Sequence, residues 1–203
     1  QDSVVSIGAR NSVYTFDESD TGVSFGTLNL INTGEGDDTL TITDISSMID
    51  AGSGNDTIEA GGMFSIFDAS EGDDTISLGG ENNRFIGGSG NDTYKFGDED
   101  FTAYIDNQGD DSSTDALLFG GTVSQNDIYF ARSGENDLEV SIFGGNQEAI
   151  LENWYVDEAQ AQQVDVFQIS GVASLNKSEV DELVDAWGKF DAGTLSQEQL
   201  TTT

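Results

Sequence analysis

Glycine and aspartate recur together in the first half of the chain, in a pattern that suits calcium binding. Four segments carry glycine at their fourth place and aspartate at their sixth. Glycine permits tight turns with positive φ, in which backbone carbonyl groups face a common centre. Aspartate adds a hard anionic oxygen, and calcium takes six to eight oxygen ligands at about 2.3–2.6 Å in irregular geometry. Because one turn has too few oxygens, we expect each ion to lie between two stacked turns.

The four segments repeat with a strict period of 18 residues. They are TGEGDDTLT (33–41), AGSGNDTIE (51–59), ASEGDDTIS (69–77) and GGSGNDTYK (87–95). Their sixth places are Asp38, Asp56, Asp74 and Asp92, and their eighth places are Leu40, Ile58, Ile76 and Tyr94. We predict calcium between turns 33–38 and 51–56, between 51–56 and 69–74, and between 69–74 and 87–92. The stacked aspartates would repel without cations, so calcium binding is expected to drive folding.

The nonapeptides between these segments keep the apolar eighth residue but lack the aspartate. They are ITDISSMID (42–50), AGGMFSIFD (60–68) and LGGENNRFI (78–86), with Ile49, Phe67 and Phe85 at the eighth place and Ser47, Ser65 and Asn83 at the sixth. Two half-coils of nine residues predict an all-β fold, a parallel β-roll or right-handed β-solenoid. The eighth-place side chains should point inward, and the acidic turns should stack along one edge.

Composition narrows the possible functions. The chain has 39 Asp and Glu against 6 Lys and Arg, a net charge of −33, and contains no Cys, His or Pro. Disulfides, thiolate metal sites and a histidine base are therefore excluded. Nucleic acid is not an expected partner because phosphate binding needs a basic patch. No apolar run approaches the roughly 20 residues of a membrane span, so we expect no membrane insertion.

Two other interpretations of the repeat are a metal-free solenoid with polar turns and a magnesium site. A metal-free fold gives no reason for aspartate at the same place in every coil. Magnesium prefers strict octahedral geometry and keeps its waters. Calcium is the cofactor that we predict.

The segment GGSGNDTYK resembles the RTX (repeats-in-toxin) nonapeptide G-G-x-G-x-D-x-U-x, and the likeness covers about 33–113. In that family the carbonyls of the first four places and the sixth-place aspartate ligate calcium. The resemblance therefore implies these ligands: Gly34, Gly36, Asp38, Gly52, Gly54, Asp56, Gly72, Asp74, Gly88, Gly90 and Asp92. Ser70 replaces the second-place glycine, and the alternate nonapeptides without aspartate imply a single ladder of ions. A turn-like segment at 107–113 predicts a fourth site through Asp111, with Asp110 as the competing candidate.

The flanks are predicted to cap the roll. Residues 1–32 should form N-terminal capping strands, in which Asp17 and Asp20 are expected to be surface charges, with a terminal ion as the alternative. Residues 114–175 should form a C-terminal β capping region with Trp154 as a core plug, and 176–203 a terminal helix. Asn176 and Glu179 form a capping-box pattern, and Gly188 is expected to end the helix. The same terminal region is a possible type I secretion signal by analogy with the family.

The resemblance implies a non-catalytic module of a larger exported bacterial protein, secreted or at the cell surface. Such a chain stays extended at low cytosolic calcium and folds on extracellular calcium, so the secretion machinery would be a transient partner. We expect a monomeric part of a longer chain, with a large adhesin as one candidate parent. The alternative is a calcium-dependent carbohydrate-binding or adhesion module. An enzyme is not expected, because without His and Cys only a carboxylate pair or an unusual serine site remains.

Overall fold

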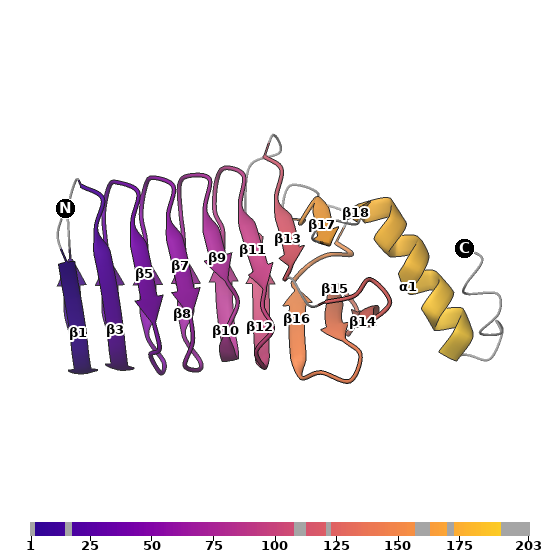
Figure 1. The fold of residues 1–203 in the computed structure, drawn as a ribbon, viewed down its shortest axis with the longest axis horizontal. Helices are drawn as coiled ribbons and strands as arrows, with labels where there is room; N and C mark the ends of the chain where they lie inside the picture. Colours follow the sequence, from indigo (N-terminus) through magenta and orange to yellow (C-terminus); the bar gives the residue numbers. More distant parts are fainter. Residues whose placement is uncertain are drawn as a thin grey trace.

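The computed structural model describes residues 3–14, 18–107, 113–120, 123–156, 163–169 and 173–191. Within these residues the strands form two nine-stranded sheets. Figure 1 shows the coils of the chain stacked side by side along the long axis, with a single helix at the C-terminal end.

The two sheets are built from alternate strands of the chain. The first has the order β1 (Ser3–Ala9), β3 (Thr21–Thr27), β5 (Thr39–Ile42), β7 (Thr57–Ala60), β9 (Thr75–Ser77), β11 (Thr93–Phe96), β13 (Ala116–Phe119), β17 (Val166–Ile169) and β18 (Ala173–Asn176). The second has the order β14 (Ile128–Ser133), β15 (Asp137–Ile142), β16 (Gln147–Leu151), β12 (Phe101–Asp106), β10 (Gly80–Ile86), β8 (Ile66–Asp68), β6 (Met48–Asp50), β4 (Leu30–Asn32) and β2 (Ser12–Tyr14).

Strands of successive coils pair in parallel, in the register that the repeat predicts. Thr39 of β5 stands opposite Thr57 of β7, which stands opposite Thr75 of β9. In the other sheet Ile49 stands opposite Phe67, which stands opposite Phe85. From β1 to β11 each step along the stack is therefore one 18-residue coil, and the predicted parallel β-solenoid is confirmed.

The core lies between the two sheets, and the eighth-place residues fill it as predicted. Leu40, Ile58, Ile76 and Tyr94 are fully buried on one side, and Ile49, Phe67 and Phe85 on the other. The rings of Phe67 and Phe85 stack with centroids 5.1 Å apart. Inward and outward residues alternate along each strand, because successive side chains of a β-strand point to opposite faces.

The regular stack continues into both flanks. In the N-terminal region, predicted as capping strands, β1 pairs with β3 and β2 with β4, both in parallel and in the 18-residue register. In the C-terminal region, β13, β16 and β17 extend the two sheets in parallel. The antiparallel strands β14 and β15 then cover the end of the second sheet, and β18 covers the end of the first.

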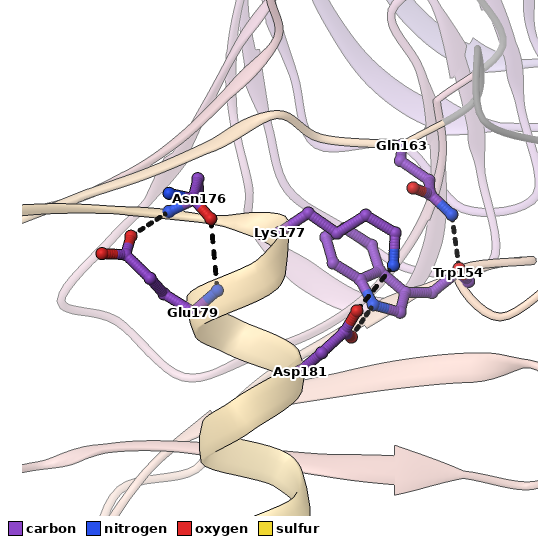
Figure 2. A network of polar contacts seen from close by, with 6 residues as sticks. All are labelled: Trp154, Gln163, Asn176, Lys177, Glu179 and Asp181. Carbon is purple, nitrogen blue, oxygen red and sulfur yellow. Dashed lines mark hydrogen bonds and ion pairs between the residues drawn. The ribbon is translucent and has the colours of Figure 1, made fainter. Parts of the chain in front are cut away.

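The helix α1 (Lys177–Asp191) begins with the predicted capping box. The backbone N–H of Asn176 donates to Glu179, and the backbone N–H of Glu179 donates to Asn176. Figure 2 shows the helix start beside Trp154, whose indole N–H donates to Asp181 at 3.0 Å. Lys177 pairs with Asp181 and lies over the Trp154 ring, so this buried tryptophan fixes the helix to the cap.

The predicted end of the helix at Gly188 is wrong, because α1 continues to Asp191. Gly188 has open space around it and no positive φ, so it does not adopt the left-handed conformation that ends a helix. Glycine inside an exposed helix costs only about 1 kcal/mol relative to alanine, which the neighbouring turns can offset. No helix in the described part of the chain is long and apolar enough to cross a membrane.

Two phenylalanines of the nonapeptide 60–68 test which side chains face the core and which face the solvent. Phe67 is fully buried in the core, whereas Phe64 is 57% exposed. We expect Phe67→Ala to lower the free energy of unfolding by about 3–5 kcal/mol through lost burial and a residual cavity. Phe64→Ala should change it by no more than about 0.5 kcal/mol. Urea unfolding in saturating calcium measures both, and equal effects of the two substitutions would contradict the assignment.

Candidate metal centre

The acidic turns are stacked so closely that their glycines are required by the backbone. The second places Gly34, Gly52 and Gly88 have φ of 91°, 101° and 102°. A Cβ on Gly52 would lie 2.0 Å from the carbonyl oxygen of Gly34 in the preceding coil. The fourth places, Gly36, Gly54, Gly72 and Gly90, also have positive φ. Ser70 adopts the same conformation, with φ of 75°, at the one second place without glycine.

The sixth-place aspartates form a ladder in the interior of the turns. Asp38, Asp56, Asp74 and Asp92 are each 1% exposed. Oδ1 of each accepts the backbone N–H of the sixth-place residue one coil earlier, as Asp56 does from Asp38 at 2.7 Å. Neighbouring coils lie about 4.8 Å apart, so the carboxylates form a buried column along one edge of the roll. We call these four residues the aspartate column.

The opposite edge of the roll makes the same ladder with neutral residues. Ser47 Oγ accepts the N–H of Asn29, Ser65 Oγ that of Ser47, and Asn83 Oδ1 that of Ser65, at 2.9–3.1 Å. These side chains are buried, and each donates onward to a backbone carbonyl group. The backbone therefore needs an acceptor at the sixth place, but it does not need a charge there.

The second carboxylate oxygen, Oδ2, of each aspartate in the column makes no hydrogen bond that holds the coils together. Oδ2 of Asp38, Asp56, Asp74 and Asp92 is buried and has no hydrogen-bond donor. A buried charge without a partner is costly, and desolvation favours its protonated form. Desolvation accordingly raises the pKa of Asp56, Asp74 and Asp92 to about 7, although the backbone N–H on Oδ1 opposes the shift. Neighbouring carboxylates of the column raise the pKa of Asp56 and Asp74 further.

A second column on the outside of the same turns avoids this repulsion. Its third places are Glu35, Ser53, Glu71 and Ser89, and its fifth places are Asp37, Asn55, Asp73 and Asn91. Charged and neutral residues thus alternate from coil to coil. The exposed Asp73 accepts two hydrogen bonds from Asn91, one from its backbone N–H and one from its side-chain amide. Both lower the pKa of Asp73, and the backbone hydrogen bond has the larger effect. Only the inner column repeats its charge in every coil, although it is the buried one.

The donor set fits a hard cation that lies between turns. The inner carboxylates supply oxygens that lack donors, and the backbone of the same turns supplies carbonyl groups. The carbonyl groups of Gly34, Gly52 and Ser70 accept one N–H each from the next coil, which leaves each a second lone pair. Oxygen donors in irregular positions match calcium. Among the described residues no group of three acidic side chains is placed to hold a metal ion, so an ion at the column would also need carbonyl groups of the turns as ligands.

The column extends beyond the four repeats, which the sequence reasoning missed. Asp20, predicted as a surface charge, is instead buried, and its N–H donates to Asp38 Oδ1. At the other end Asp92 N–H donates to Asp115, whose N–H donates to Asp165. A signal was present, because Asp115-Ala-Leu117 and Asp165-Val-Phe167 repeat the order aspartate, any residue, apolar residue. Asp17, Asp110 and Asp111 lie outside the described residues.

No protein-family model matches the chain, and a search of curated proteins finds no similar sequence. The assignment of the aspartate column therefore depends on its own geometry and chemistry.

The raised pKa values predict an unusual dependence of stability on pH in metal-free buffer. Asp56, Asp74 and Asp92 bind protons up to about pH 7 when folded, but only up to about their ordinary value of 3.8 when unfolded. Because the folded state binds more protons in this window, its stability should fall as the pH rises from about 4 to about 7. Far-ultraviolet circular dichroism in metal-free buffer at pH 5 and pH 8 measures this as a change in the fraction of folded chain.

The triple variant Asp56→Asn, Asp74→Asn, Asp92→Asn provides the control. It keeps most of the net charge but removes the three shifted groups, so the loss of stability between pH 5 and pH 8 should become smaller. An unchanged pH dependence would show that the general acidity of the chain, and not the column, causes it.

Proposed function

We propose that the chain is a non-catalytic calcium-binding β-roll, in which ions shared between stacked turns neutralise the aspartate column. The observation that carries this proposal is the set of buried Oδ2 atoms without donors on Asp38, Asp56, Asp74 and Asp92. The neutral ladder of Ser47, Ser65 and Asn83 argues against a purely structural explanation of the aspartates, because serine and asparagine supply the same acceptor.

Folding would then depend on calcium. The column has one carboxylate in each coil, and the chain has a net charge of −33. Without cations, that charge opposes the compact state. A ligand that binds only the folded state stabilises it by mass action, so the binding free energy of the ions becomes folding free energy. Extracellular modules bind calcium with dissociation constants of roughly 10⁻⁴–10⁻³ M. Sites of this affinity would be empty at the calcium concentration of the cytosol and filled at that outside the cell.

The same physics supports a role in export. A chain that stays extended at low calcium suits passage through a secretion channel, and folding outside the cell would oppose its return. We propose that the module supports type I secretion of a larger bacterial surface or secreted protein, as the RTX-like repeat of residues 33–113 implies. The capped helix α1 follows the roll in the chain, on the same side of the repeats as the export signal of such cargo.

Two neighbouring aspartates provide a sharp test of calcium binding. Asp74 belongs to the buried column, whereas Asp73 is exposed in the outer column. Asp74→Asn keeps the Oδ1 acceptor for the N–H of Asp56 but removes the anionic oxygen. We expect this variant to bind calcium at least tenfold more weakly and to be more stable than the wild type in chelator. Isothermal titration calorimetry measures the affinity, and circular dichroism in EDTA measures the fraction of folded chain in the variant and the wild type.

Asp73→Asn changes the net charge by the same amount at the adjacent residue. It should leave the calcium affinity within about twofold, because the Asp73 side chain is exposed and solvent screens its charge. Equal weakening by both substitutions would indicate a general electrostatic effect and would reject the column as the binding site.

A further inference from the structure

Asn107 occupies a special place at the C-terminal end of the aspartate column. The pairing of Ile86 with Asp106 puts Asn107 one coil after Gly87, which is the first place of the turn 87–92. In the three turns before it the first places are Ala51, Ala69 and Gly87, whose side chains have no polar group. At these turns nothing from the first place can reach the carboxylate as a donor, whereas Asn107 has an amide.

The Asn107 side chain is buried and makes two hydrogen bonds inside the roll. Its Nδ2 donates to Oδ2 of Asp115 at 2.7 Å, and its Oδ1 accepts the hydroxyl of the fully buried Tyr94 at 2.8 Å. Oδ1 of Asp115 accepts the N–H of Asp92 at 2.8 Å, as in the rest of the ladder. Both oxygens of Asp115 are therefore satisfied by protein groups.

The contrast with the preceding coils is direct. Asp56, Asp74 and Asp92 have the same ladder hydrogen bond on Oδ1, but their Oδ2 atoms lack a donor. In Asp115 the atom equivalent to those Oδ2 atoms is in contact with an amide. The amide of Asn107 therefore fills the position that is open beside Oδ2 of Asp56, Asp74 and Asp92, so a cation would have to displace it.

We infer that Asn107 ends the calcium column, because its side-chain amide replaces the divalent ion as the partner of Asp115. This inference rests on the proposed function, and it places the last shared ion between the turns 69–74 and 87–92. Asn107 and Asp115 are then joined to the roll through Tyr94 by these hydrogen bonds, without a metal ion.

The number of bound ions tests this inference. Asn107→Asp replaces the donor with an anionic oxygen beside Asp115, so this variant should bind one more calcium per chain than the wild type. Asn55→Asp adds the same charge to the exposed outer column and should bind the same number as the wild type. Native mass spectrometry of the full chain, in saturating calcium at pH 7.5, counts the ions in all three proteins.

A second substitution guards against a variant that fails to fold. Asn107→Ala gives this turn the same first-place residue as the turns that begin at Ala51 and Ala69. It should also gain one ion, because Asp115 loses its amide donor and its Oδ2 then resembles those of Asp56, Asp74 and Asp92. Unchanged ion counts in both Asn107 variants would overturn the inference while leaving the proposed calcium column intact. A wild-type chain that binds no calcium would instead reject the proposed function.

Discussion

Repulsion along the aspartate column is the constraint on which the rest of the structure depends. Four buried carboxylates follow one another at the spacing of β-coils, about 4.8 Å. With an effective dielectric of 20, two charges at this distance repel by about 3 kcal/mol. Three such neighbouring pairs oppose folding by an amount comparable to the whole net stability of an ordinary domain, about 5–15 kcal/mol. The column must therefore be protonated or occupied by cations when the roll is folded.

The two edges of the roll separate the structural requirement from the functional one. On both edges a sixth-place oxygen accepts a backbone N–H from the neighbouring coil, so each coil is held to the next by a side chain as well as by the sheets. Serine and asparagine meet this requirement on one edge without charge. Aspartate on the other edge adds an oxygen that the protein leaves without a donor. We propose that this extra oxygen binds a cation when the carboxylate is ionised.

Much of this architecture could be predicted from the sequence because the repeat is strict. The 18-residue period fixes the register of β5, β7, β9 and β11, and the apolar eighth places identify the core. The period fails where the spacing changes. Asp115 follows Asp92 by 23 residues, so its place in the column depends on the path of the chain between them. Asp20 does keep the period, because it lies 18 residues before Asp38, but its motif is hidden by Gly22, which stands where the other coils have a large apolar residue.

The central claim is that the roll folds because cations neutralise the aspartate column. Far-ultraviolet circular dichroism of the purified chain at pH 7.5, first in EDTA and then during a calcium titration, tests it most directly. The account predicts a largely unfolded spectrum in chelator and a cooperative gain of β-structure as calcium is added, with magnesium at equal concentration much less effective. A complete β-sheet spectrum in chelator, unchanged by calcium, would contradict it.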